Sequence, residues 1–133
     1  MYGNTHRWDA ACYAALAGCG QGSDAPSDPS ARAELRKQAL NRVRADLAMR
    51  AGQAASANPR DRGMAARLLA AWFRDSDLDG VRPGPGRIDV PADERAAWDA
   101  FWADVHAALE QARKPPVAKP PAPKPATARA PGG

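Results

Sequence analysis

Cysteine and histidine are scarce in this chain, whose 133 residues contain two of each. Cys12 and Cys19 are seven positions apart, which on a helix places them on one face about two turns apart, too far for a disulfide. His6 and His106 create no Cys-x-x-Cys or His-Glu-x-x-His spacing. We therefore expect buried, reduced thiols, no metal and no cofactor.

Long apolar runs and enzyme motifs are also missing. No window approaches the run of about 18 apolar residues that a membrane span needs, and the first residues lack the charged start and continuous apolar stretch of a secretory signal. The chain has no Gly-x-Ser-x-Gly elbow, no Walker Gly-Lys-Ser or Gly-Lys-Thr, and no His-Arg-Asp or Asp-Phe-Gly set. These absences predict a cytoplasmic protein that is not an enzyme, has no catalytic residues and does not associate with a membrane.

Alanine, by contrast, is abundant, with 32 of the 133 residues. Because alanine is the strongest helix former and β-branched residues are few, the composition predicts an all-α fold. Apolar residues at helical spacing, separated by Gly and Pro, indicate four helices: about residues 5–17, 31–51, 59–74 and 91–112. The segment 75–90, rich in Pro and Gly, is predicted to be a loop.

The ends of these helices carry recognisable signals. Asp28 or Ser30 is suited to cap the second helix, which is expected to stop near Gly52. Asn58 is suited to cap the third helix, with Pro59 in its first turn. The sequence thus predicts where two of the helices begin.

Two further patterns concern packing. The last helix gathers large rings, so we expect it to close the core; these are Trp98, Phe101 and Trp102. The second helix is predicted to have a wet, basic face, formed by Arg32, Arg36, Lys37, Arg42 and Arg44.

The charge of the chain is concentrated at its C-terminus. Residues 114–133 carry four cations, no acid and seven of the 13 prolines, whereas residues 1–113 carry 15 basic and 15 acidic groups. This composition predicts a disordered, polyproline-biased tail after a helical module at 1–113. The tail contains a Pro-x-x-Pro run at Pro120–Pro123 that resembles an SH3-type ligand. Because the module itself is neutral, nucleic acid is disfavoured as a partner, although a nucleic-acid accessory protein that binds weakly through its tail remains the alternative.

The acidic run from Asp75 to Gly80 matches the first half of a calcium-binding EF-hand loop. The second half does not match, because Gly86 occupies the position of the bidentate Glu. A solvated acidic turn or a helix C-terminal cap is the preferred interpretation, and a calcium-responsive switch is a further alternative.

Four segments, in order, resemble the tetratricopeptide-repeat (TPR) region of bacterial serine/threonine kinases, especially those of planctomycetes. RWDAACYAALAGCGQG resembles their YNAACxxALAGxGxG, and RKQALNRVRADLA resembles RQQALDWLRADLA. AAWFRDSDLDGVR and PADERAAWDAFWADVHAALEQA resemble LxHWQxDPDLAGVRD and LPADERxAWxxLWADVxALLxxA. Arg42 departs from the pattern, which has Trp there.

The resemblance implies TPR-like antiparallel helical hairpins and a non-catalytic role. A helical repeat buries its apolar face against neighbouring repeats, so without them the Trp8 stripe of the first helix is expected either to fold back on the other three helices or to bind another helix. We therefore expect a protein–protein interaction or C-terminal capping module. Its partner is expected to be a helical protein or peptide, such as the upstream TPR repeats of a kinase. The candidate contact residues, all in the first segment, are Tyr2, Trp8, Tyr13 and Leu16.

Overall fold

The computed structural model describes residues 3–114, with side chains from Trp8 onward. It contains α1 (Gly3–Gly18), α2 (Pro29–Ala54), α3 (Pro59–Trp72), the 3₁₀ helix η1 (Ser76–Val81) and α4 (Ala92–Arg113). The described residues contain no strand, which confirms the all-α prediction. Tyr2 and the predicted disordered tail after Lys114 lie outside the described residues.

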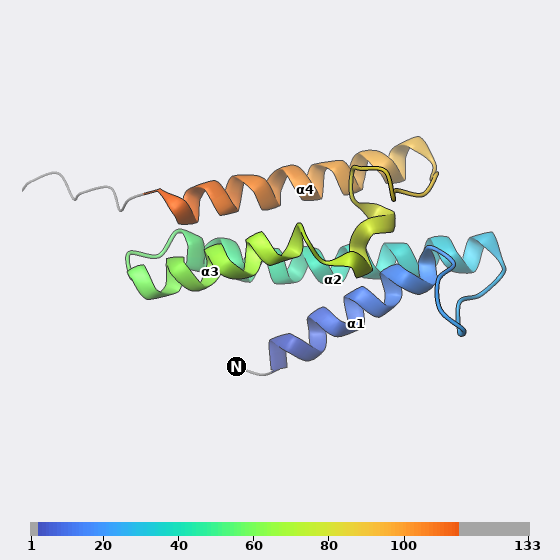
Figure 1. The fold of residues 1–133 in the computed structure, drawn as a ribbon, viewed down its shortest axis with the longest axis horizontal. Coiled ribbons are helices and arrows are strands. Elements are labelled where there is room, and N and C mark those ends of the chain that lie inside the picture. Colours follow the sequence, from blue (N-terminus) through green and yellow to red (C-terminus); the bar gives the residue numbers. More distant parts are fainter. Residues whose placement is uncertain (1–2, 115–133) are drawn as a thin grey trace, which may run out of the picture.

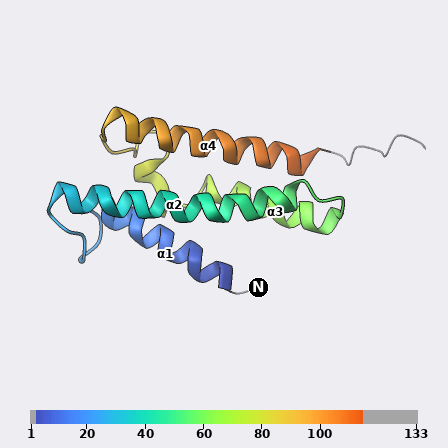
Figure 2. The ribbon, with the colours of Figure 1, turned by 180° about the vertical axis from the view of Figure 1, so that it is seen from behind.

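Consecutive α-helices run antiparallel, as predicted (Figures 1 and 2). α4 lies along α2 and α3, whereas α1 packs on α2 and η1 at the opposite edge of the molecule. The N-terminal half of α1 diverges from the other helices in both views. Within residues 3–114, no helix combines the length and the apolarity that crossing a bilayer requires.

The predicted helix starts of α2 and α3 are confirmed. The Asp28 carboxylate accepts a hydrogen bond from the Ala31 amide at 3.0 Å, and the Asn58 side chain accepts one from the Arg60 amide at 2.9 Å. The helix α2 continues to Ala54, two residues beyond the predicted stop near Gly52. Ala54 is fully buried, so packing of this last turn outweighs the low helix propensity of a single glycine.

The segment that was predicted as a loop is partly helical. η1 places Leu78 and Val81 in the core, and its N-cap is Asp75, whose carboxylate accepts a hydrogen bond from the Asp77 amide at 3.0 Å. The same carboxylate accepts a hydrogen bond from the Trp8 indole, so the prediction of a solvated turn is wrong for Asp75. The Asp75 amide donates to the Trp72 carbonyl at 3.3 Å at the end of α3, as the interpretation as a helix C-terminal cap predicted. The segment is helical because it is amphipathic and its apolar side chains pack into the core.

The core is built around the rings of α4, as predicted. Trp98, Phe101 and Trp102 are buried, and Phe101 packs against Trp72 of α3 with ring centroids 6.4 Å apart. The Trp102 indole donates to the Val81 carbonyl at 3.1 Å, which satisfies its only donor and ties η1 to α4.

α1 and α2 approach closely where α1 ends. A Cβ at Gly18 would lie 2.6 Å from Cγ of Arg36, so only glycine fits there. Arg36 is 7% exposed, which corrects the prediction that it lies on a wet face. Its guanidinium donates to the Gly18 carbonyl at 2.7 Å and to both carboxylate oxygens of Glu94, so one side chain joins the ends of α1, α2 and α4.

Candidate functional site

The candidate site is the surface of α1, the edge helix. The inner side of α1 consists of small buried residues, which allow close packing: Ala11, Ala14, Ala15 and Ala17. The outer side carries Asp9, Tyr13 and Leu16, at helical spacing i, i+4 and i+7. Tyr13 is 60% exposed and Leu16 is half-buried. Because a Tyr ring is a large apolar surface, its exposure on an edge helix makes this side a candidate for a contact.

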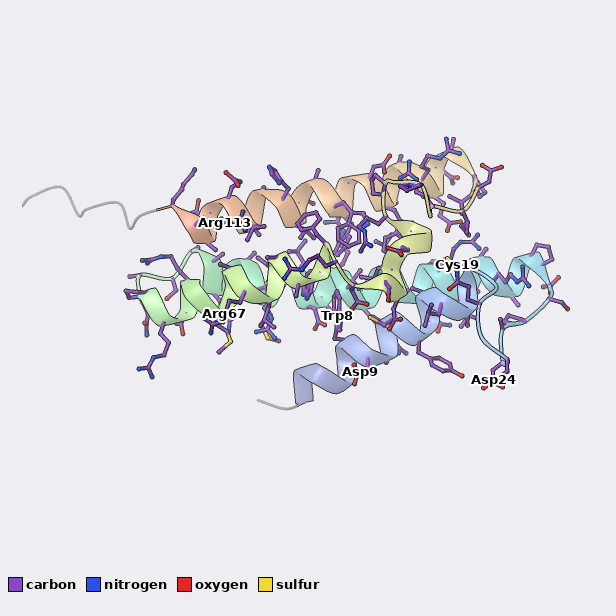
Figure 3. The ribbon with its side chains drawn as sticks, viewed as in Figure 1. Trp8, Asp9, Cys19, Asp24, Arg67 and Arg113 are labelled. Carbon is purple, nitrogen blue, oxygen red and sulfur yellow. The ribbon has the colours of Figure 1, made fainter. Side chains whose placement is uncertain are left out.

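Tyr13 and Leu16 line a small cavity that we call the Tyr13 hollow, together with Ala17 and residues 21–25. Its volume is about 190 Å³. The Tyr13 hydroxyl donates to the Asp24 carboxylate at 2.9 Å, which joins the helix to the following loop and raises the pKa of the phenol. The loop turns at Gly20 and Gly22, which have φ of 79° and 96°, values that glycine adopts at little cost. Figure 3 shows Asp24 on this loop, which follows the end of α1.

Trp8 lies on a different side of α1, between α1 and α3 (Figure 3). Its ring stacks on Trp72 with centroids 4.2 Å apart and an interplanar angle of 14°. Its indole donates to the Asp75 carboxylate at 3.1 Å. Trp8 is therefore mainly an internal packing residue, and its half-buried ring leaves only part of its surface for a partner.

That remaining surface lines a second cavity, of about 210 Å³, between α1, α2 and α3. We call it the Trp8 groove. Its lining combines two indoles and aliphatic groups with charged ones: Trp8, Asp46, Arg50, Leu68, Ala71, Trp72 and Asp75.

Acidic groups gather beside the Trp8 groove. The Cys12 thiol donates to the Asp75 carboxylate at 3.5 Å, and ligand atoms of Cys12, Asp75 and Asp77 lie within 4.8 Å of one another. This arrangement resembles part of a metal site. However, burial raises the pKa of the Cys12 thiol, and the nearby carboxylates of Asp75, Asp77 and Asp9 raise it further, so the thiolate that a metal binds is disfavoured.

The pKa of Asp77 is also raised, first by burial and then by the negative charges of Asp75 and Asp9. The described residues supply no ion-pair partner for these three carboxylates; the pairs they contain use Asp79, Asp89, Glu94, Asp99 and Asp104 instead. Of these three carboxylates, only that of Asp75 lines the Trp8 groove, whose lining also contains the carboxylate of Asp46 and the guanidinium of Arg50.

The structure does not place the predicted contact residues in one site. Tyr13 and Leu16 share the Tyr13 hollow, Trp8 belongs to the groove, and Tyr2 lies outside the described residues. Sequence reasoning did not identify the other residues that line the Tyr13 hollow and the Trp8 groove, in particular Asp24 and Leu68. Asp24 could have been found, because it follows α1 closely in sequence and lies in a segment whose composition indicates a polar loop. No local sequence pattern places Leu68 or Asp75 beside α1.

The groups that most often carry out nucleophilic chemistry are placed apart. Cys12 is buried on α1, Cys19 is half-buried at the end of that helix, and His106 is exposed on α4. Burial raises the pKa of the Cys19 thiol, although the nearby Arg36 guanidinium opposes this shift.

Comparison with protein-family models, with curated proteins and with solved structures finds no match to the chain. The resemblance to kinase TPR regions therefore stays a prediction from the sequence, and the site is interpreted from its geometry.

Proposed function

We propose that this chain is a non-catalytic docking module whose α1 edge binds a helix of a partner protein. The observation that carries the proposal is the 60% exposure of Tyr13 on the edge helix α1, which packs against α2 and η1. An exposed aromatic ring with a polar end is a common anchor of protein interfaces.

The spacing of the outer side favours a helix as the partner. Asp9, Tyr13 and Leu16 form a ridge along α1, and a helix packs with its own ridges in the grooves beside such a row. The Tyr13 hollow lies next to this ridge and has room for an apolar side chain from the partner. The partner suggested by the sequence resemblance is a TPR repeat of a serine/threonine kinase, packed against α1 as one repeat packs on the next.

The chemistry of the described residues supports a role without catalysis. Both thiols have raised pKa values, which keeps them protonated at neutral pH and weakens them as nucleophiles. The buried guanidinium of Arg36 is held by Glu94 and by a backbone carbonyl, so its charge is used within the fold.

The test is a calorimetric titration of the full chain with the helical repeats that precede the corresponding segment in a kinase of the family it resembles. We expect binding that weakens by about tenfold or more in Tyr13→Ala, the loss typical of an interface anchor. Tyr13→Phe keeps the ring and loses the bond to Asp24, so it should retain most of the affinity.

Met64 supplies the matched control, because it is 41% exposed but lies on α3. Met64→Ala should leave the affinity unchanged. Absence of binding to the folded chain, or equal affinity of the Tyr13→Ala and Met64→Ala variants, would contradict the proposal. Phosphotransfer or ATP hydrolysis by the purified chain would contradict its non-catalytic part.

A further inference from the structure

The indole of Trp98 is a buried hydrogen-bond donor that lacks an acceptor. Trp98 is 1% exposed, and its Nε1 has no hydrogen-bond partner within the part of the chain that the structure describes. The indoles of Trp8 and Trp102, by contrast, donate to the Asp75 carboxylate and the Val81 carbonyl. Because a buried N–H without an acceptor is costly, the Trp98 indole points to a partner from outside the fold.

Trp98 lines a cavity between α2 and α4, which we call the Trp98 cavity. Its volume is about 530 Å³, within the range of clefts that bind ligands. The apolar side chains that line it beside Trp98 are Ala33 and Leu40 of α2 and Ala97 of α4. The cavity therefore has room for an acceptor group among apolar side chains.

A second cavity, which we call the Ile88 cavity, continues the first one along α2. Its volume is about 560 Å³. The two cavities share three lining residues: Ser30, Ala33 and Arg36. Together they follow α2 from Pro29 to Leu40, over roughly 16 Å of helix. They lie at the end of the molecule where α2 and α4 begin and α1 ends (Figures 1 and 2). We call the two cavities together the α2 groove.

An extended peptide suits the α2 groove better than a helix does. The main-chain carbonyls along a helix accept its own hydrogen bonds, whereas an extended chain presents free carbonyls along its length. At about 3.3 Å per residue, roughly five extended residues span the distance between Pro29 and Leu40. One carbonyl of such a segment supplies the acceptor that the Trp98 indole lacks.

The charges around the α2 groove are nearly balanced. Arg36 and Glu94 pair with each other across the groove. The other charged residues that line it are two cations and three acids: Arg32, Lys37, Glu34, Asp89 and Asp93. The groove therefore does not favour a strongly charged occupant such as nucleic acid, and binding should depend little on salt.

We infer that the α2 groove binds an extended, uncharged segment of a partner protein, and that the Trp98 indole donates to a main-chain carbonyl of this segment. Small apolar side chains of the segment pack beside Ala33 and Ala97. The α2 groove shares no lining residue with the Tyr13 hollow, so the chain has a second docking surface in addition to the α1 edge.

An NMR titration of the isotope-labelled full chain with an uncharged, capped pentapeptide, acetyl-Val-Ser-Val-Ser-Val-amide, tests this inference. The β-branched residues of the peptide favour the extended conformation. We expect the Trp98 indole N–H resonance to move downfield as the carbonyl binds, at low and at high salt alike. The Trp102 resonance is the internal reference, because its indole already donates to the Val81 carbonyl in the core.

Two outcomes of the titration would overturn the inference. One is a Trp98 resonance that does not move up to the solubility limit of the peptide. The other is a response only to the charged peptide acetyl-Lys-Ser-Lys-Ser-Lys-amide or to a DNA oligonucleotide, which would assign a charged occupant to the groove.

Two alanine-to-leucine variants supply the matched control. Ala33 lines both cavities, so Ala33→Leu fills the groove near its centre and should abolish the response of Trp98 to the uncharged peptide. Ala45 is exposed on the same helix and lines neither cavity, so Ala45→Leu should leave the response intact. Equal responses of the two variants would contradict binding in the α2 groove.

The spectrum of the free chain gives an independent readout. The rings of Trp98 and Phe101 are nearly perpendicular, at 89° with centroids 5.9 Å apart, an arrangement in which an indole N–H can point at the face of a neighbouring ring. A Trp98 N–H resonance far upfield would identify the Phe101 ring as its acceptor and overturn the inference, whereas we expect no such upfield shift. Because these readouts do not involve Tyr13, their failure would leave the proposed function intact.

Discussion

The thiol of Cys19 rests on Gly80 so closely that a Cβ at Gly80 would lie 2.5 Å from Sγ. This contact joins the end of α1 to η1 through two residues that are 61 positions apart in sequence. It explains why Gly80 is buried within a short helix, where a larger residue would hold α1 away from the core.

Gly80→Ala should therefore destabilise the fold by about 1–3 kcal/mol, the usual cost of overpacking a tight contact. Cys19→Ala removes the sulfur and should recover part of this loss in the double variant. Urea unfolding of the parent, the two single variants and the double variant measures the coupling between the two sites. If the two substitutions change the free energy of unfolding in a strictly additive way, the contact between Cys19 and Gly80 is not the cause of the destabilisation.

Gly52→Ala should act in the opposite direction. Gly52 lies within α2, and a Cβ there would meet no atom within 4 Å. Alanine has the higher helix propensity and restricts the unfolded chain, so we expect a gain of about 0.5 kcal/mol in the free energy of unfolding. A loss of stability in the same urea assay would mean that α2 does not continue through this position.

The two ion pairs that join α2 to α4 should contribute unequally to the free energy of unfolding. Glu94→Gln leaves the buried Arg36 guanidinium without its carboxylate and should cost about 2–4 kcal/mol, because an uncompensated buried charge is expensive. Asp104→Asn removes an exposed partner of Arg44 and should cost less than about 1 kcal/mol. Thermal unfolding of both variants compares them, and equal losses would contradict the buried role of Arg36.

Asp77→Asn should raise the stability at neutral pH. The pKa of Asp77 is above its ordinary value of 3.8 in the folded state, mainly through burial and then through the charges of Asp75 and Asp9. A raised pKa means that the protonated form favours the native state: this contribution is fully present below the unfolded pKa and is lost as the pH rises through the folded pKa. At pH 7 the ionised group therefore opposes folding.

The variant should accordingly melt at a higher temperature than the parent at about pH 7, and the difference should vanish at about pH 3, where Asp77 is protonated in both states. Glu34→Gln, an exposed site on α2, is the control and should show no such pH dependence. A gain that persists unchanged at low pH would show that repulsion among the three carboxylates is not its cause.

Local chemistry explains which parts of the fold could be predicted from the sequence. Asp28 and Asn58 cap their helices through hydrogen bonds within three residues, so the sequence alone reveals them. The rings of α4 recur at helical spacing and enter the core as that spacing predicts. Signals of this kind need no knowledge of the rest of the chain.

The parts that could not be predicted depend on partners far away in the sequence. Asp75 looked like a solvated turn residue, because its donor Trp8 is 67 positions away. Arg36 looked like a surface cation, because Glu94 is 58 positions away. The same reason explains the site: Tyr13 and Leu16 were identified on one helix, but the Trp8 groove exists only once α1, α2 and α3 have packed.

The most direct test of the proposed docking role is amide hydrogen exchange of the full chain with and without the TPR repeats of a kinase from the family that the sequence resembles. Binding at the α1 edge predicts slower exchange in residues 9–25, which contain Tyr13, Leu16 and Asp24, and unchanged exchange along α4 around His106. Unchanged exchange in residues 9–25 under saturating repeats, or protection centred on α4, would contradict it.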